Sequence, residues 1–413
     1  MNKFYLLLSI MGIFTINSCN RTVADSAKER ANDVTKNVEL KQNIVKQSND
    51  FAFNFFKQIN DLESKKEKDI FVSPLSASLA FSMASAGAEG KTQQEMLSAL
   101  DFNGDTQQQV NDFSYYVIKK LLSGDKTTKI LVANSIWTLQ GFPVYKQFTD
   151  ILTKYYFAEN RVLDLNEAKA VKEVNKWCSD NTQGLIKEMV SNISGIKVML
   201  INALYFKGVW KDQFNKSNTH PDKFFNIDGS QTEVDFMYRS FKGRIWHDDT
   251  VSLINLPYGN GKFEMSVILP NEESDIDEFI STLSAENIDK WVKCNSNYKI
   301  RLLLPKFNSE YETSDNLIKA MQNLGMNLAF TSQADFSKMS KFQLMIDRAN
   351  QKAVIKVNEE GTEAAAVTTI GMRLTSVAPQ EPTFDFTVNR PFVYLIREVD
   401  SGAVLFIGKK SKF

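Results

Sequence analysis

Histidine, cysteine and proline are scarce in this chain of 413 residues, which contains 2, 3 and 9 of them respectively. The two histidines, His220 and His247, are far apart and lie in polar surroundings, so we expect both on the surface. A histidine-rich metal site or a Ser/His/Asp triad therefore has little material in this chain. His247 precedes two aspartates, but such a short polar run is typical of a solvated turn. Because no glycine-rich phosphate loop occurs either, the sequence predicts no enzyme, no metal site and no cofactor.

The chain also lacks an excess of charge of either sign and lacks internal repeats. Lysine plus arginine and aspartate plus glutamate both number 49, so no basic field attracts phosphate backbones and we expect no nucleic-acid partner. A hydrophobic fraction of 43% with 24% charged residues is typical of a globular protein with a large core. From Phe51 onward no Pro/Gly/Ser-rich break divides the chain, which predicts one large domain over residues 49–413.

The N-terminus carries a short apolar run that follows Lys3 and covers residues 4–16. The run is too short to span a bilayer and is typical of a secretion signal. The sequence Ile16-Asn17-Ser18-Cys19 resembles a bacterial lipobox, which implies cleavage after residue 18 and acylation of Cys19. The alternative is an ordinary cleaved signal with an incidental cysteine. The lipobox interpretation predicts an exported protein, held by a lipid anchor at Cys19 on the bacterial outer membrane or cell surface.

Residues 19–48 are polar and have few large apolar side chains, which predicts a tether between the lipid and the folded body. Fully extended, such a tether would reach on the order of 90 Å. The remaining cysteines, Cys178 and Cys294, each lie near a tryptophan in an apolar helical pattern. We expect them to be buried free thiols rather than a disulfide framework.

Helical periodicity dominates the first half of the body and strand patterns dominate the second. We expect helices over Phe51 to Ile59, Ser73 to Ala88, Gln107 to Leu122 and Ala168 to Asp180. Short β-branched or aromatic runs predict strands over Ile130 to Leu139, Val198 to Phe206, Ser252 to Leu256, Met265 to Leu269, Ile300 to Leu304, Ala353 to Val357, Val393 to Ile396 and Val404 to Ile407. This mixture predicts an α+β fold with more than one sheet.

Several stretches, in their order and spacing, resemble the serpin family over nearly the whole body. They are Phe71 to Ser76, Gly87 to Thr92, Val174 to Trp177 with Asn181 to Gly184, Leu200 to Trp210, Leu304 to Phe307, Leu324 to Met326, Ala334 to Ser337, Asn358 to Ala366 and Asn389 to Phe392. The resemblance implies an α+β serpin fold with a helix-rich N-terminal half, three β-sheets and an exposed reactive loop at about residues 359–382. It also implies a monomer that inhibits proteases and is not an enzyme.

The resemblance implies a polar cluster that lets the main sheet open, formed by Ser73, Ser76, Asn202 and Gln351, and we assign Trp210 to it as well. The family often has a histidine where this chain has Gln351, ten residues before the hinge glycine. An amide can both donate and accept, as neutral histidine does. Ser73 followed by proline also fits a plain helix N-cap, which is compatible with the cluster.

The segment that resembles the hinge of the reactive loop consists of Glu359, Gly361, Thr362, Glu363, Ala364, Ala365 and Ala366. Every second residue from Thr362 to Met372 is small or apolar and uncharged, whereas Glu363 and Arg373 fall on the other face. A strand buried on one face needs this alternation. A mobile alanine-rich linker, the alternative, has no reason to sort its charges. We therefore predict that the loop can insert into the sheet as a strand, and that Thr362 lies near the surface before insertion.

The bond that the target protease cleaves follows from the hinge by counting, because in serpins it usually lies sixteen residues after the hinge glutamate. From Glu359 this spacing selects Thr375 and Ser376, which suits an elastase-like enzyme. Arg373 is the alternative for a trypsin-like enzyme, with Leu374 and Met372 as further candidates, and papain-like proteases are also possible targets.

A non-inhibitory serpin that acts as a binding or carrier protein at the cell surface is the alternative function. The small hinge residues favour inhibition. Glycosaminoglycan activation is not indicated, because the expected helix over Gln107 to Leu122 has only one basic pair, Lys119 and Lys120.

Overall fold

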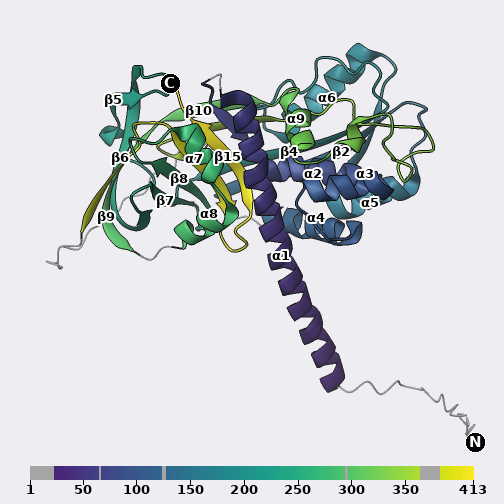
Figure 1. Cartoon of the computed structure of the whole chain (residues 1–413), viewed down its shortest axis with the longest axis horizontal. Helices are drawn as coiled ribbons and strands as arrows, with labels where there is room; N and C mark the ends of the chain where they lie inside the picture. Colours follow the sequence, from purple (N-terminus) through teal and green to yellow (C-terminus); the bar gives the residue numbers. More distant parts are fainter. Residues whose placement is uncertain (1–22, 65–66, 123–126, 294–295, 363–381) are drawn as a thin grey trace, which may run out of the picture. The chain divides into compact units, whose positions relative to one another are not determined.

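The computed structural model describes residues 23–64, 67–122, 127–293, 296–362 and 382–413 (Figure 1). The chain divides after Asn43 into two compact units, and the second, Ile44–Phe413, contains every strand described below. Helix α1 runs from Val23 to Glu63. We expected residues 19–48 to form a polar tether, and from Val23 onward the segment is helical. The segment is rich in Ala, Glu, Lys and Gln, whose helix propensity is high. The helical rise per residue is less than half of the extended one, so the expected reach does not apply.

The C-terminal part of α1 belongs to the core of the second unit. Phe51, Phe55 and Ile59 recur at helical spacing and are fully buried. The rings of Phe51 and Phe55 stack with their centroids 5.6 Å apart. The helix predicted over Phe51 to Ile59 is thereby confirmed, within a longer element.

A six-stranded sheet carries the segment that resembles the hinge. Its strand order is β10 (Phe307–Glu312), β11 (Lys352–Asn358), β12 (Gly361–Thr362), β4 (Val198–Val209), β2 (Thr128–Leu139) and β3 (Glu159–Leu163). Trp137 of β2 and Ile201 of β4 face helix α6 (Glu167–Asn181), with Trp137 edge-on to Trp177 of that helix. Leu204 and Phe206 point to the opposite face and join the main core. Because side chains alternate along a strand, the sheet separates a small core under α6 from the large one.

The other strands form a nine-stranded path that contains two of the three expected sheets. Its order is β1 (Ile70–Val72), β15 (Val404–Lys410), β14 (Phe392–Glu398), β8 (Phe263–Pro270), β7 (Val251–Tyr258), β6 (Gln231–His247), β9 (Asn297–Pro305) and β13 (Thr383–Thr387), with β5 (His220–Phe225) beside β6. Strand β6 pairs with β9 over Phe236 to Arg244 and then with β7 over Ile245 to His247. The long strand β6 is thus shared, so two sheets run into one another.

Helix α2 (Pro74–Ser85) lies between the two sheets and contacts β4 and β15. Nearly all of its residues are buried, and its N-terminus is capped by the Ser73 side chain, which accepts a hydrogen bond from the backbone of Ser76. The remaining helices are α3 (Gly90–Ala99), α4 (Gln107–Leu122), α5 (Lys146–Tyr156), α7 (Ile276–Thr282), α8 (Ala285–Val292) and α9 (Asn316–Asn323), with single 3-10 turns η2 (Lys216–Asn218) and η3 (Leu328–Phe330). The predicted α+β class is confirmed.

Two further expectations from the sequence concern the exposure of the histidine and cysteine side chains. His220 and His247 are exposed, as predicted. Cys178 is a buried free thiol whose pKa burial raises to about 12, whereas Cys294 lies outside the described residues. Within the ranges that the structure describes, no helix has both the length and the apolar character needed to cross a bilayer.

Candidate functional site

Strand β12 is a short strand that lies between β11 and β4 in the six-stranded sheet. Its two residues, Gly361 and Thr362, pair with Asn358 and Val357 of β11 on one side and with β4 on the other. Beyond Thr362 the described chain provides no strand between β4 and β11, and neither pairs with the other. Among the described residues β4 and β11 are thus unpaired with each other beyond Thr362, and we call this stretch between them the gap.

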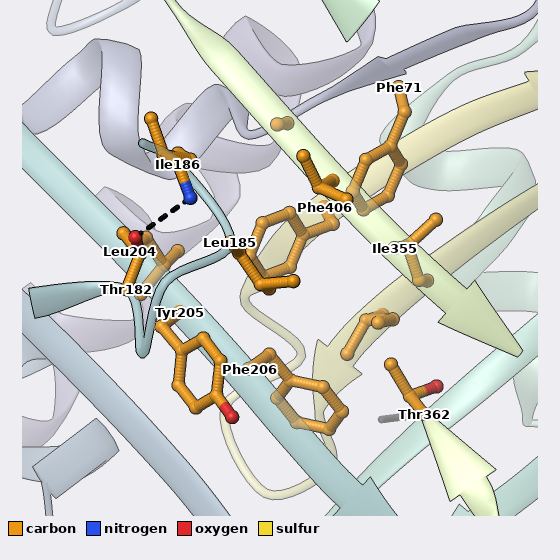
Figure 2. Close-up of a pocket in the computed structure, with 13 residues that line it drawn as sticks. Phe71, Thr182, Leu185, Ile186, Leu204, Tyr205, Phe206, Ile355, Thr362 and Phe406 are labelled. Carbon is orange, nitrogen blue, oxygen red and sulfur yellow. Dashed lines mark hydrogen bonds between the residues drawn. The ribbon is translucent and has the colours of Figure 1, made fainter. Parts of the chain in front are cut away.

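A small cavity of about 20 Å³ lies in this gap, enough for a single water molecule (Figure 2). Phe206 of β4 lines one side, Ile355 of β11 the other, and Thr362 lies at one end. The loop after α6 covers the gap with Leu185 and Ile186. The backbone amide of Ile186 donates to the Thr182 hydroxyl at 3.0 Å, which fixes this loop. A longer strand between β4 and β11 would pass next to these two apolar side chains.

Thr362 is buried, with 2% of its surface exposed, which corrects our expectation that it lies near the surface in the intact protein. Its hydroxyl lies 2.5 Å from the hydroxyl of Tyr258. The Tyr258 ring stacks on Trp210 at 4.4 Å and an interplanar angle of 10°. Burial raises the pKa of Tyr258 far above its usual value, so this tyrosine remains a neutral hydrogen-bonding partner. The turn before β12 returns the chain into the sheet, which explains why Thr362 is already inside.

Gly361 has a conformation and a close contact that only glycine can provide. Its φ angle is +151°, in a region that residues with a side chain rarely adopt. A Cβ at this position would overlap with the backbone carbonyl oxygen of Gly208 in β4. In turn, a Cβ on Gly208 would lie 2.7 Å from the ring of Tyr258. Glycine at position 361 lets β12 lie beside β4, and glycine at position 208 makes room for the ring of Tyr258.

Backbone hydrogen bonds anchor the turn that precedes β12. The amide of Trp210 donates to the carbonyl of Glu360, and the amide of Phe214 donates to the carbonyl of Glu359, both at 2.9 Å. The indole of Trp210 donates to the carbonyl of Asn358 at 2.9 Å. Trp210 is therefore part of the hinge seat, which we define as Trp210, Tyr258, Gly208 and the residues of β12 that they contact.

The two glutamates of the turn are held by lysines. The carboxylate of Glu359 accepts from the Thr219 hydroxyl at 2.9 Å and lies 3.3 Å from the Lys306 ammonium. Burial works against its charged form, but hydrogen bonds from its own backbone amide and from Thr219, together with Lys306, outweigh burial and lower the pKa of Glu359. Glu360 forms a 2.6 Å ion pair with Lys216. Both carboxylates thus pair with a lysine and help to fix the turn.

The residues assigned to sheet opening lie in two places. The Gln351 amide bonds reciprocally with the backbone of Ser73, accepting at 3.0 Å and donating at 2.7 Å. The Ser76 hydroxyl donates to the carbonyl of Asn202 at 3.5 Å, whereas the side-chain amide of Asn202 donates to Asn134 at 2.6 Å. These four assigned residues lie along β4, β11 and the start of α2, but Trp210 is in the hinge seat. Gln351 thus binds backbone atoms, at the position where the family often has a histidine.

Several residues of the assigned loop lie outside the described part of the chain. They are Glu363, Ala364, Ala365, Ala366, Met372, Arg373, Leu374, Thr375 and Ser376, and Cys19 lies outside it as well. Sequence reasoning did not find Tyr258, Thr219 and Asn134, because each acts through a strand that is distant in the sequence. In the described ranges no three His, Cys, Asp or Glu side chains gather as a metal ion would require.

The chain resembles known proteins over most of its length. The model of the serpin family, described as serine protease inhibitor, matches residues 46–412. The chain is 30% identical over 382 residues to an uncharacterized serpin-like protein of Thermococcus kodakarensis, covering 91% of this chain and 87% of that one. It is 34% identical over 350 residues to intracellular coagulation inhibitor 2 of Tachypleus tridentatus, covering 83% and 85%.

Solved structures give the same result. The native state of tengpin, a thermophilic serpin, superposes with a TM-score of 0.81 at 29% identity, over 90% of this chain and 95% of that one. Human thyroxine-binding globulin in complex with thyroxine also reaches 0.81, at 24% identity over 90% and 99%, which shows the shared fold alone. The family model covers most of the chain and the relatives reach 30% identity or more, so this chain belongs to the serpin family, whose members are generally protease inhibitors rather than enzymes.

Proposed function

We propose that the protein inhibits serine endopeptidases as a suicide substrate. The observation that carries the proposal is the seat of β12: a strand of two residues, buried between β4 and β11, leads toward a stretch where the described parts of these two strands do not pair with each other. The sequence after Thr362 has the alternation that a continuation of β12 needs. Insertion of the loop as an added strand is an established process in serpins, so the proposal concerns only its occurrence in this chain.

In the proposed mechanism the protease serine attacks the carbonyl carbon of the scissile residue. An ester forms between enzyme and inhibitor, and the peptide bond breaks as its nitrogen leaves as a protonated amine. The new end of the loop is then free to follow β12 into the gap. Insertion carries the ester-linked protease with it. Inhibition requires that insertion be faster than hydrolysis of the ester.

Thr375 and Ser376 are the proposed scissile pair for an elastase-like target, and Arg373 is the alternative for a trypsin-like one. Leu374 and Met372 remain candidates for the residue before the scissile bond. A papain-like protease remains a candidate target and would form a thioester with the loop. A cut after Arg373 leaves an insertable strand two residues shorter than a cut after Thr375. We therefore expect more simple turnover with trypsin-like enzymes than with elastase-like ones.

Incubation with an elastase-like, a trypsin-like and a papain-like protease tests the proposal. We expect a covalent complex that survives denaturing electrophoresis with at least one serine protease, and a cut located by mass spectrometry between Arg373 and Ser376. The same protease with its catalytic serine blocked serves as the control and should give no complex. If every enzyme cuts the loop and remains active, the inhibitory function is wrong.

This chain shares its fold with thyroxine-binding globulin, which was solved with thyroxine bound, so the fold alone does not distinguish an inhibitor from a carrier protein. The residues of the hinge must make that distinction. A carrier does not need an insertable loop. In this chain the strand would continue from Thr362, a small residue that is buried and whose hydroxyl contacts the hydroxyl of Tyr258. This arrangement favours inhibition.

We also propose that the protein is exported and lipid-anchored through Cys19 to the bacterial outer membrane or cell surface. The support is the lipobox-like sequence that ends at this cysteine. Cys19→Ala should move the protein from the membrane fraction to the soluble fraction after cell lysis, and should abolish incorporation of labelled palmitate. Ser18→Ala, which keeps a small residue before the cysteine, is the control. Unchanged membrane association of Cys19→Ala would contradict the anchor.

A further inference from the structure

A second and larger cleft, of about 800 Å³, lies beside the hinge turn and is distinct from the gap in the sheet. It is lined by the end of β11, the turn from β9 to β10, the 3-10 turn η2 and the end of β15. Its volume is in the range of small-ligand sites, but charged side chains dominate its lining, where such sites are usually apolar. Four lysines line it: Lys216, Lys306, Lys356 and Lys410. We propose that this cleft binds a small multivalent oxyanion and that binding loosens the hinge turn.

The four lysines of this cleft differ in the carboxylates with which they form ion pairs. Lys410 is nearly buried, pairs with Asp69 at 2.6 Å and is a fixed part of the core. Lys216 and Lys306 hold the two hinge glutamates, at 2.6 Å and 3.3 Å. Lys306 also lies 3.6 Å from Asp235. Lys356 is exposed and has no carboxylate within ion-pair distance in the described part of the chain.

A multivalent oxyanion fits this arrangement better than other ligands do. It can meet the uncompensated charge of Lys356 and at the same time replace a hinge carboxylate on Lys306 or Lys216. A multivalent anion offers a separate negative charge to each of two lysines, which a monovalent anion does not. Lysine ammonium groups act as compact point charges that suit phosphate and carboxylate groups alike. Phosphate esters and polycarboxylates therefore share the chemistry that the cleft recognises.

Binding is coupled to the hinge because the ligand competes for the same cations. Glu359 and Glu360 form the turn that leads into β12, and each is held by one of the two lysines. An anion on Lys306 and Lys216 removes these charge contacts, while the backbone bonds from Trp210 and Phe214 remain. The turn is then held less firmly but keeps its place. The effect on protease inhibition rests on the proposed function, whereas binding and hinge loosening do not.

Titration calorimetry with tripolyphosphate and, separately, with citrate tests binding, against sodium chloride at matched ionic strength. Lys356→Glu should weaken binding by about tenfold or more, because it replaces a charge-assisted contact with repulsion. Lys319→Glu, an equal charge change at an exposed lysine of α9, is the matched control and should bind like the parent. Both variants are first checked for an unchanged melting temperature. Preference for one of the two probes assigns the oxyanion to the phosphate or the carboxylate class.

Hydrogen exchange over residues 355–362 tests the coupling. With saturating ligand these amides should exchange several-fold faster in the parent and Lys319→Glu, but not in Lys356→Glu at the same ligand concentration. Equal binding by all three proteins, or an equal effect of sodium chloride, would overturn the site and leave only charge screening. Binding without faster exchange would overturn the coupling. Each result is obtained without a protease, so it is distinguishable from a failure of the proposed inhibition.

Discussion

If the proposed function holds, Thr362→Arg should turn this proposed protease inhibitor into a protease substrate. Thr362 is buried against Tyr258, so the arginine would bring a cation into an interior that offers it no carboxylate among the contacts of Thr362. Burying an unpaired charge costs several kcal/mol, even when a long side chain partly escapes to water. Because Thr362 is already buried in the intact protein, we expect the arginine to keep β12 out of its seat. Its entry during insertion then carries a penalty of about 3 kcal/mol, which slows that step more than about 100-fold and gives the acyl-enzyme time to hydrolyse.

The measurement is the number of inhibitor molecules consumed per protease molecule inactivated, together with the amount of covalent complex on a denaturing gel. Cleavage of the loop should persist, because the scissile region is unchanged. Since Thr362 is already inside the intact protein, the uncleaved variant should also melt at a lower temperature than the parent. The large stabilisation expected after cleavage should shrink.

Glu363→Arg is the matched control for this variant. Glu363 lies outside the described residues, but the alternation along the sequence assigns it to the face opposite Thr362. Its side chain does not need to be buried on insertion, so this variant should keep most of its inhibition. If the two arginine variants inhibit equally well, the alternation does not govern insertion.

Gly361→Ala should remove the hinge from its seat and also impair inhibition strongly. The φ angle of +151° disfavours any residue with a side chain, which costs about 1–3 kcal/mol. In addition, the new methyl group would overlap with the carbonyl oxygen of Gly208, a backbone atom within β4 that cannot swing aside. We expect residues 359–362 to lose their protection from hydrogen exchange, and trapping to give way to turnover.

Gly229→Ala is the control that separates the effect of a positive φ angle from the effect of steric overlap. Gly229 also has a positive φ, +79°, but no atom lies within 4 Å of the position that its Cβ would take. It lies in the turn between β5 and β6. This variant should lose some stability yet keep full inhibition. Unchanged exchange protection of residues 359–362 in Gly361→Ala would show that the fit against Gly208 does not hold β12.

Local pattern predicted the elements that are both regular and buried. Helix α4 has the predicted bounds, Gln107 to Leu122, because its apolar residues recur at helical spacing. Strand β8 is buried throughout and was readily found from its continuous apolar run. Strand β6 was not predicted, because most of its residues are exposed or half-buried and its sequence mixes charged and aromatic side chains. Edge strand β3 was missed for the same reason: only its last residue is buried.

Only those residues of the site that lie within a family-like stretch of sequence could be predicted. Resemblance led to Ser73 and Gln351, and the structure brings them together although 278 positions separate them. It also led to Trp210, but a strand position eight residues beyond Asn202 is about 26 Å away, so the two cannot belong to one cluster. Tyr258 gave no signal, because its role depends on which strands become neighbours. The depth of Thr362 likewise follows from a turn whose anchors, the amides of Trp210 and Phe214, are not apparent from the sequence.

The two residues of β12 have a kinetic consequence for the proposed insertion. The chain-entropy cost of bringing a loop to a distant strand falls mainly on the first contact, and here that contact exists on both sides before any protease arrives. Growth of the strand from Thr362 is therefore propagation without nucleation. No search for the correct register precedes it, because the pairs Gly361 with Val209 and Thr362 with Gly208 already set the register against β4. Leu185 and Ile186 line the cavity that Thr362 also lines, so we expect them to be among the first side chains that the growing strand contacts, and substitutions there to change the rate of insertion.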